Sequence, residues 1–287
     1  MQQRTVLNGI KSSYEGTYVY VDERNVNPSP DGKIDNPFVD LQSALDSLAG
    51  KEGLCVVEVI SSGSSALQGE VKNTSLVLKG QMDKNSPGLE ISITSEMDQL
   101  IVTDFASSGL NITLSERIDT LRINNVQGDF YEGAQIYITA QEEAYISTFT
   151  MNSLIANINL QGQFGTTTIA NSALGNIMMQ GTFSYTPYFN NCSISNGITL
   201  YSEESDVSVM FIGCDISSID GGSEEHPLYI NLKNSRIVRE PMGNVVLQDE
   251  SPYVQYQPVN YSLEEYSQGN IIDHLKAIDI KLGELQS

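Results

Sequence analysis

Two groups of carboxylates lie on either side of the centre of this chain, and by residue type they are well suited to acid–base chemistry. The first group is Asp98, Asp104, Asp129 and Glu132, and the second is Glu203, Glu204, Asp206, Asp215 and Asp220. Two carboxylates about 5 to 10 Å apart can hydrolyse a glycosidic bond. The alternative is that most of them lie in turns, where Asp stabilises bends and Glu is solvated.

The segment between the two groups contains no charged side chain. From Ala144 to Ser202 there is no Asp, Glu, Lys, Arg or His. Glycoside hydrolases generally need two carboxylates, and lyases need a base and commonly a cation or a cationic side chain. The centre of the chain therefore supplies no such group. Its Asn, Gln, Ser, Thr, Tyr and Met side chains suit a surface buried against identical neighbours, because an unpaired buried charge is costly.

Other kinds of site have little support in the sequence. His226 and His274 have no Cys or His at the spacing of a zinc site, and the runs Asp31–Asp35 and Asp215–Asp220 lack the calcium-loop spacing. No phosphate-binding glycine loop, nucleophile elbow or dinucleotide fingerprint is present. We therefore predict no catalytic residue, no cofactor and no metal ligand.

Several tyrosines could stack on sugar rings, or could lie in a subunit interface, where Tyr is enriched. They are Tyr131, Tyr137, Tyr145, Tyr185, Tyr188 and Tyr201. Both interpretations remain open at this point.

A short sequence pattern repeats about every 20 residues, which is typical of a β-solenoid. An apolar residue is followed two positions later by Asn, Asp or Gly, which tolerate positive φ, where a strand bends sharply. The predicted bend residues are Asp104, Asn125, Asn152, Asn171, Asn191, Gly213 and Asn234. We expect their side chains to form an asparagine ladder between rungs rather than a polar binding stripe, because they occupy the bend itself.

A second apolar track has the same period. It consists of Ile112, Ile136, Ile158, Ile177, Ile198 and Ile219. Together the two tracks predict an all-β, single-stranded parallel β-helix with rungs of about 21 residues. Between Leu54 and Leu100 the sequence gives no register. Cys192 and Cys214 would lie on neighbouring rungs, close enough to bridge, but we expect buried thiols, because three cysteines suggest a reducing compartment.

The rest of the chain divides around this solenoid. We predict an N-terminal arm (1–15), a strand and capping helix (16–50), the β-helix (51–239), an extended arm (240–269) and a C-terminal helix (270–287). For the capping helix we expect Asn36 as the N-cap and Pro37 at the first helical position. Phe38, Leu41, Leu45 and Leu48 would form its apolar face, ending at Gly50.

The C-terminal helix carries apolar residues at coiled-coil spacing. They are Ile271, Leu275, Ile278, Leu282 and Leu285. This seam is too short to associate alone, so it would act with other contacts between the same chains. The alternative is a lone amphipathic helix that caps the end of the solenoid.

The net charge of −21 disfavours nucleic acid and anionic membranes as partners. No apolar run approaches the roughly 18 residues that would cross a bilayer, and the start of the chain does not resemble a secretory signal. We expect neither a nucleic-acid partner nor membrane insertion.

One part of the chain resembles a known family. The strand Thr17–Val21, the Asp31–Gly32 loop, Asn36–Phe38, Leu41–Leu45 and Val56–Val59 together resemble the N-terminal cap of right-handed parallel β-helix proteins of the pectin-lyase-like superfamily. That superfamily includes phage tailspikes and polysaccharide lyases. The resemblance implies a right-handed solenoid, but the fold carries both enzymes and inert shafts.

These observations lead to one functional hypothesis and two alternatives. We expect a non-catalytic virion protein, assembled in the host cytoplasm as a homotrimeric, tailspike-like or fibre-like appendage. Its partners would be itself, other virion proteins at one end, and a host receptor or glycan. The first alternative is a polysaccharide lyase or glycoside hydrolase that uses carboxylates outside residues 144–202. The second is a non-catalytic glycan binder that uses exposed tyrosines.

Overall fold

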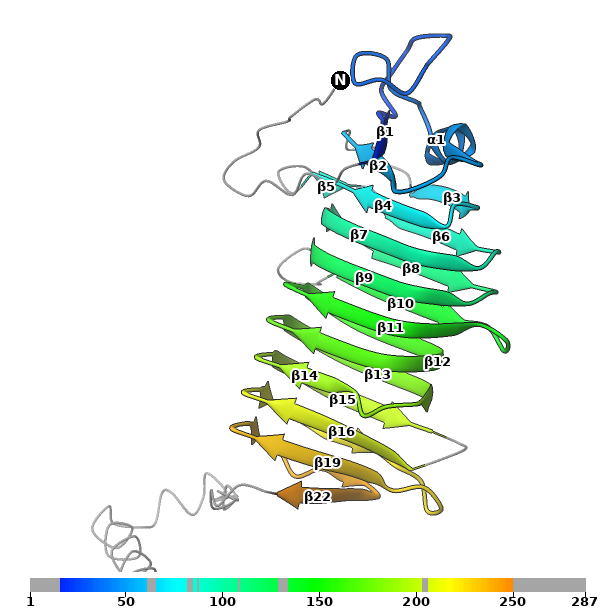
Figure 1. Ribbon diagram of the computed structural model, residues 1–287. Coiled ribbons are helices and arrows are strands. Elements are labelled where there is room, and N and C mark those ends of the chain that lie inside the picture. The colour runs from blue at the N-terminus through cyan, green and yellow to red at the C-terminus, as the bar shows by residue number, and fades with distance from the viewer. Residues whose placement is uncertain are drawn as a thin grey trace, which may run out of the picture. The chain divides into compact units, whose positions relative to one another are not determined.

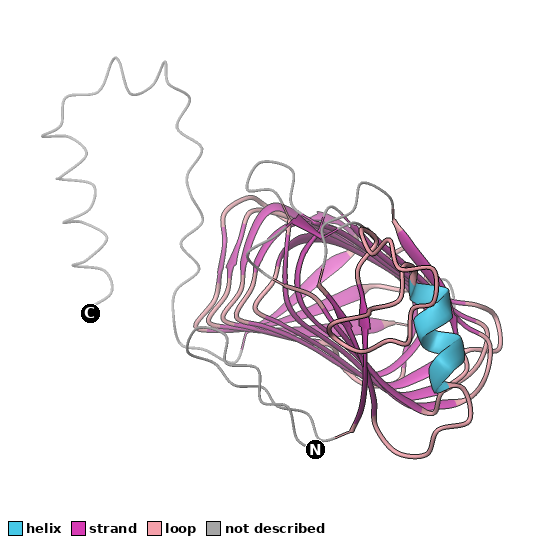
Figure 2. Cartoon of the chain, turned by 90° about the horizontal axis from the view of Figure 1, so that it is seen from above, coloured by secondary structure: helices cyan, strands magenta, loops and turns pink. Residues whose placement is uncertain are grey.

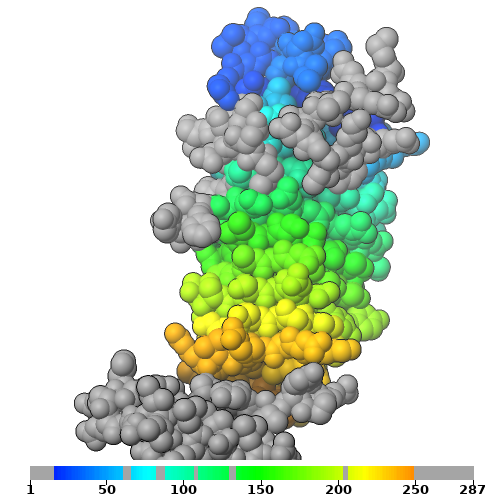
Figure 3. All heavy atoms as spheres, turned by 90° about the vertical axis from the view of Figure 1, so that its left-hand side faces the viewer, coloured from blue at the N-terminus to red at the C-terminus, as the bar shows by residue number. Residues whose placement is uncertain are grey.

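The chain folds into a parallel β-helix, as the sequence predicts. The computed structural model describes residues 16–60, 66–81, 85–86, 88–107, 109–128, 134–202 and 206–249. Within these ranges the solenoid has about eight turns of about 21 residues, and its strands pair in parallel (Figure 1). Successive rungs follow one another along the axis in chain order (Figure 3).

Two broad faces run along the solenoid, which Figure 2 shows from above, looking at the end that carries the helix. Face A contains β1 (Thr17–Val21), β2 (Cys55–Val59), β4 (Ser75–Lys79), β7 (Met97–Ser107), β9 (Ile118–Gln127), β11 (Tyr145–Asn152), β14 (Tyr188–Asn190), β16 (Val207–Ile212), β19 (Leu228–Lys233) and β22 (Val245–Asp249). Face B contains β3 (Leu67–Val71), β6 (Leu89–Ile93), β8 (Gly109–Leu114), β10 (Ala134–Ala140), β15 (Ser193–Tyr201), β18 (Ile219–Gly221) and β21 (Met242–Gly243).

The remaining strands connect the faces. β12 (Ile155–Ala170) and β13 (Ala173–Phe183) are long enough to pass from the bend through face B towards face A. β5 (Asn85–Ser86), β17 (Asp215–Ile216) and β20 (Arg236–Ile237) belong to the short stretch that follows the bend. The register that the sequence leaves open between Leu54 and Leu100 aligns Cys55 with Leu76 and Leu76 with Leu100.

The interior is one apolar core, built from stacked columns of inward-facing side chains. On face A, the residue two positions before the bend forms such a column, in which Ile169 pairs with Phe189 and Phe189 pairs with Phe211. The rings of Phe189 and Phe211 stack with their centroids 4.9 Å apart. Because each rung contributes the same position, a single apolar residue per turn builds a continuous core.

The second track needs one correction. The register joins Ile136, Ile158, Ile177, Ile198 and Ile219 into one column, as predicted. Ile112 pairs with Ile138 instead, so it lies in the neighbouring inward column. Both columns are buried, and spacing alone does not separate them, because inward residues two positions apart share one environment.

The predicted bends coincide with positive φ at six of the seven positions, with φ of 62° at Asp104, 49° at Asn171 and 63° at Gly213, for example. The prediction is wrong at Asn152, because Ser153 carries the positive φ of 58°. Met151 and Leu154, which flank the bend, are buried. Burial of these two apolar side chains therefore decides the register against the local preference for Asn.

The capping helix begins later than predicted. α1 spans Leu41–Leu48, and its N-cap is Asp40, whose side chain accepts the Ser43 N–H at 2.7 Å. The expected start at Asn36 and Pro37 is wrong, because Phe38 continues a β-bridge to Val21. The helix packs its apolar face on the first rungs, where a Cβ on Gly69 would lie 2.5 Å from Leu45.

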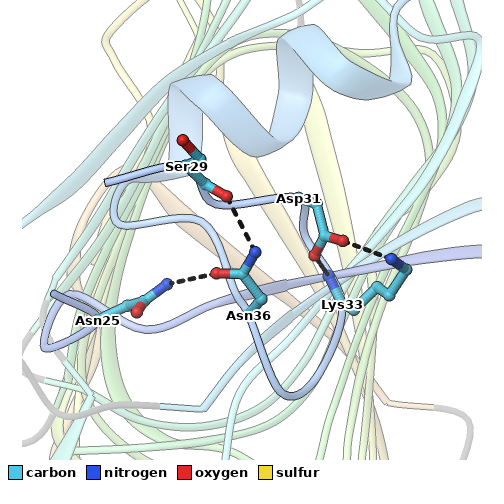
Figure 4. A network of polar contacts seen from close by, with 5 residues as sticks. All are labelled: Asn25, Ser29, Asp31, Lys33 and Asn36. Atoms are coloured by element: carbon cyan, nitrogen blue, oxygen red, sulfur yellow. Dashed lines mark hydrogen bonds and ion pairs between the residues drawn. The ribbon is translucent and has the colours of Figure 1, made fainter. Parts of the chain in front are cut away.

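Asn36 instead organises the loop before the helix (Figure 4). Its side-chain amide donates to the Ser29 carbonyl at 3.0 Å, and its own oxygen accepts from Asn25 at 3.5 Å. Beside it, Lys33 pairs with Asp31. The acidic run at 31–35 is therefore part of a loop that these side-chain contacts hold together.

Three predictions concern residues outside the described ranges. The N-terminal arm (1–15), residues 250–269 of the extended arm and the coiled-coil seam from Ile271 to Leu285 fall there. So do Tyr131, Asp129, Glu132, Glu203 and Glu204. These stay predictions. The predicted boundary at residue 239 is wrong, because β21 and β22 pair with β18 and β19 and continue the solenoid to Asp249.

Candidate functional site

The bend carries an asparagine ladder, as predicted. The Asn171 amide donates to the Asn152 side-chain oxygen at 2.9 Å, and the Asn191 amide donates to that of Asn171 at 3.0 Å. Nearer the N-terminus, Asn125 donates to Asp104 at 2.8 Å. Asn152 belongs to the ladder through its side chain, although the bend itself falls one residue later. The asparagine side chains of the ladder hydrogen-bond to one another, so they need no ligand as a hydrogen-bond partner.

A second, inner ladder lies one residue after the bend and was missed in the sequence. It consists of Ser172, Cys192, Cys214 and Ser235. Each hydroxyl or thiol donates to the carbonyl two residues earlier, at 2.7 Å from Ser172 to Ala170 and 3.4 Å from Cys192 to Asn190. Each also accepts an N–H from the preceding rung, such as that of Leu154 on Ser172 at 3.1 Å. The two cysteine thiols therefore make the same hydrogen bonds as the serine hydroxyls of this ladder.

Both of these cysteines are free and buried, as expected. The hydrogen bond between the two thiols is the first cause that raises the pKa of Cys192, and burial adds to it. For Cys192, the inner ladder and the raised pKa both favour a structural role, because the reactive form of cysteine is the thiolate. The same hydrogen bond lowers the pKa of Cys214 to about 7, so the structural role of Cys214 rests on the inner ladder alone.

A shallow groove follows the outside of this bend. Its lining includes Asn191, Cys192, Asp215, Asn234 and Arg236. The Arg236 guanidinium donates two hydrogen bonds to the Asp215 carboxylate, at 3.0 and 2.6 Å. These hydrogen bonds lower the pKa of Asp215. The groove thus combines amides with one exposed ion pair, and the carboxylate in it is held ionised.

The first carboxylate group does not converge in the described residues. Asp104 is half-buried at a bend and accepts the Asn125 amide, so its role is structural. Asp98 is exposed near the start of β7. In the second group, Asp206 faces His226 at 3.4 Å, Asp215 binds Arg236, and Asp220 lies on face B.

The two groups also lie far apart along the axis. Five strand steps on face A separate β7, which holds Asp104, from β16, which precedes Asp215. At about 4.8 Å per step this is about 24 Å. Among the described residues, Asp98 and Asp104 are therefore too far from Asp206, Asp215 and Asp220 to form a catalytic pair with any of them.

Face B carries an uncharged outer surface across its central rungs. One outward column is formed by Asn111, Tyr137, Asn159, Met178 and Thr199. The column beside it is formed by Thr113, Thr139, Gln161, Gln180 and Tyr201. We call these ten residues the neutral surface. Charges return at its ends, with Glu90 before Asn111 and Asp220 after Thr199.

The structure separates the predicted tyrosines. Tyr137 and Tyr201 are exposed on the neutral surface, at 44% and 41%. Tyr188 points outward on face A, and Tyr185 lies in the turn after β13. Tyr145 is half-buried, with its hydroxyl 3.4 Å from Ser184. The five predicted tyrosines in the described ranges therefore form no single stacking platform.

Met178 is the exposed methionine of the neutral surface, and the sequence analysis did not single it out. Its side chain is 45% exposed beside Thr199 and Asn159. The signal was present as an apolar residue between the inward Ile177 and Met179. Which of these neighbours points outward depends on the register, and the pairing of Ile177 with Ile158 settles it.

In the described ranges, no group of three or more His, Cys, Asp or Glu side chains is placed to hold a metal ion. In the same part of the chain, no helix has the length and apolar character needed to cross a membrane.

Comparison with known proteins gives no relative. No family model, no curated protein and no solved structure matches the chain. The fold nevertheless defines a class: this is a parallel β-helix protein, consistent with the superfamily whose cap it resembles. Proteins of this fold include tailspike-like shafts and proteins that act on polysaccharides.

Proposed function

We propose that this chain is a structural virion protein, the β-helical body of a homotrimeric tailspike-like or fibre-like appendage. The observation that carries the proposal is the neutral surface, which crosses the central rungs of face B without a charged side chain. A catalytic groove in this fold would need charged groups, whereas a contact between identical chains is favoured by their absence.

The composition of the neutral surface suits a protein interface. Burying an unpaired charge between chains costs several kcal/mol, and like charges would face one another across a symmetric contact. Amide and hydroxyl side chains can pair across such a contact, and exposed Tyr and Met are enriched in interfaces. The high net charge of −21 makes this uncharged area more notable, because the acidic residues lie elsewhere.

Two other parts of the chain would complete the assembly. The seam Ile271, Leu275, Ile278, Leu282 and Leu285 would hold three C-terminal helices together, in support of the contact between solenoids. Residues 250–269, which follow the last strand of the solenoid, are the segment best placed to dock on other virion proteins. A host receptor or glycan would then meet the exposed end or side of the shaft.

One pair of variants tests the contact. Met178→Lys places a charge in the centre of the neutral surface, and Glu143→Lys places the same side chain in the exposed turn between β10 and β11. We expect Met178→Lys to lower the solution mass, or to make it depend on concentration, while Glu143→Lys keeps the mass of the wild type. Equal masses for both variants would show that the neutral surface is not a contact between chains.

The second candidate is a polysaccharide lyase or hydrolase that uses the groove along the bend. The specific observation in its favour is that Asp215 and Arg236 lie together in that groove. A lyase needs a base and a cationic group that stabilises the developing negative charge. If the chain degrades any member of a polysaccharide panel, Asp215→Asn should abolish that activity. Retained activity would assign the reaction elsewhere.

A further inference from the structure

The outer side of face A is buried over its first rungs, which is unexpected for a surface of a solenoid. Val56, Val77 and Ile101 pair in register on β2, β4 and β7. They point away from the core, because their neighbours in each strand point into it. Their exposed fractions are nevertheless 0%, 0% and 6%. They form an apolar cluster of their own, separate from the main core.

The adjacent outward column is buried as well. It contains Tyr20, Glu58, Lys79 and Thr103. Tyr20 and Glu58 are only 6% and 4% exposed. The Glu58 carboxylate lies 3.5 Å from the Lys79 ammonium group. Burial is the first cause that raises the pKa of Tyr20. We call the two outward columns over β1, β2, β4 and β7 the covered patch.

The covered patch ends abruptly along the axis. Arg122 follows Ile101 in the outward column, and it is exposed. Thr150, one rung further, is half-buried. The covering material therefore lies over the first rungs only, and it spans about three strand steps, or about 14 Å.

The described residues supply no apolar covering layer. The apolar side chains that pack against the cluster in the described ranges are Tyr18 and Leu54. Tyr18 belongs to β1, and Leu54 immediately precedes β2, so both lie in the same sheet. The exposed fractions in the covered patch are those of a single chain, so a layer above the sheet has to come from another part of the same chain.

Three segments outside the described ranges border the patch: residues 1–15, residues 61–65 after β2 and residues 82–84 after β4. The last two are short, and Met82 is their one apolar residue, so residues 1–15 are the better source of an apolar layer.

The segment 1–15 leads directly into face A, because Thr17 is the first residue of β1 and donates to the Leu54 carbonyl at 3.0 Å. Fifteen residues can extend to about 50 Å, several times the length of the patch. They include the apolar residues Val6, Leu7 and Ile10. Residues after Asp249 start seven strand steps beyond Ile101, about 34 Å away.

We propose that residues 1–15 lie across the outer side of β2, β4 and β7 in the same chain and cover Val56, Val77 and Ile101. This strap adds a third layer to the first rungs and keeps their outward valines from water. The inference is independent of the trimer, and it leaves residues 250–269 as the segment available for docking on other proteins.

Limited trypsin cleavage of the full-length chain tests the strap, because Lys11 lies within it. Val77→Lys puts a charge under the strap, and Thr150→Lys puts the same charge in the outward column beyond it. We expect cleavage after Lys11 to accelerate about tenfold in Val77→Lys and to stay at the wild-type rate in Thr150→Lys, since cleavage follows the open population. Equal rates in all three proteins would overturn the proposal.

A second variant guards against misfolding of Val77→Lys. Ile10→Asp leaves the solenoid unchanged and should loosen the strap, so we expect it to increase binding of an apolar dye such as ANS and to accelerate cleavage after Lys11. Unchanged dye binding together with unchanged cleavage would overturn the proposal. Protection of Lys11 that falls on dilution of the wild type would contradict the same-chain strap and assign the segment to a second copy.

Discussion

Asn191 and Asn171 are joined across neighbouring rungs by one hydrogen bond of 3.0 Å, from the amide of the former to the side-chain oxygen of the latter. Both residues have positive φ, 53° and 49°. Asn thus performs two tasks at the bend: it tolerates the left-handed conformation, and it satisfies its own amide on the next rung. The bend can therefore repeat without a ligand.

Gly213 interrupts the asparagine ladder, and Gly213→Asn should restore it. The glycine has φ of 63°, and a Cβ there meets no atom within 4 Å. Asn tolerates this conformation and would lie between Asn191 and Asn234. We expect a gain of about 0.5 to 1 kcal/mol in the free energy of unfolding, measured by denaturant titration. A loss of stability would mean that the ladder does not continue past Asn191.

Replacement of Cys214 by Ser should be tolerated, whereas replacement by Ala should destabilise the fold. Serine already fills the equivalent positions at Ser172 and Ser235, so Cys214→Ser keeps both hydrogen bonds and should change stability by less than about 1 kcal/mol. Cys214→Ala leaves the buried Cys192 N–H without its acceptor and should cost about 1 to 3 kcal/mol. Thermal unfolding of the two variants separates them. Equal losses would show that packing, rather than hydrogen bonding, retains the thiol.

Gly181 should tolerate no side chain. A Cβ there would lie 1.9 Å from the Gly162 carbonyl oxygen, and φ is 138°. We expect Gly181→Ala to cost at least about 3 kcal/mol or to prevent folding. Gly213→Ala is the matched control, because its new methyl group meets open space, and it should cost only about 1 to 2 kcal/mol. If the control is as damaging as Gly181→Ala, the close approach of the two rungs is not the cause.

The ion pair of Asp215 and Arg236 predicts a small pH dependence. The hydrogen bonds from Arg236 lower the pKa of Asp215 from its ordinary value of 3.8. A lowered folded-state pKa stabilises the fold above the unfolded-state pKa, and this contribution disappears as the pH falls through the lower value. The stability difference between wild type and Asp215→Asn should therefore be present at neutral pH and absent at strongly acidic pH.

The same difference should be small and should shrink in high salt, because both side chains are largely exposed, at 51% and 72%. Denaturant titrations at neutral and acidic pH, with and without added salt, check both points. A difference that persists when both states are protonated would assign the effect of Asp215 to packing.

The period of the bend predicted the fold because one residue type meets one local requirement in every turn. Where burial competes with that requirement, the prediction failed. Met151 and Leu154 are buried, so the bend moved from Asn152 to Ser153. The helix start failed for a similar reason. Asn36 and Pro37 match a helix start in sequence, but Phe38 pairs with Val21, and Asp40 becomes the cap.

The candidate site was predictable in composition but not in arrangement. The lack of charge between Ala144 and Ser202 is visible in the sequence. The grouping of Tyr137, Met178 and Tyr201 on one face depends on the alignment of rungs whose lengths differ, so spacing alone does not give it. The inner ladder was missed because Ser and Cys share a role there that sequence similarity does not reveal.

The solution mass of the full-length chain tests the central claim most directly. Light scattering over a range of concentrations should give three times the chain mass of 31.4 kDa. A version that ends at Asn270, without the C-terminal seam, should then give a mass that is smaller or that depends on concentration. A full-length mass of 31.4 kDa at every concentration would contradict the trimeric shaft and leave the neutral surface without its proposed partner.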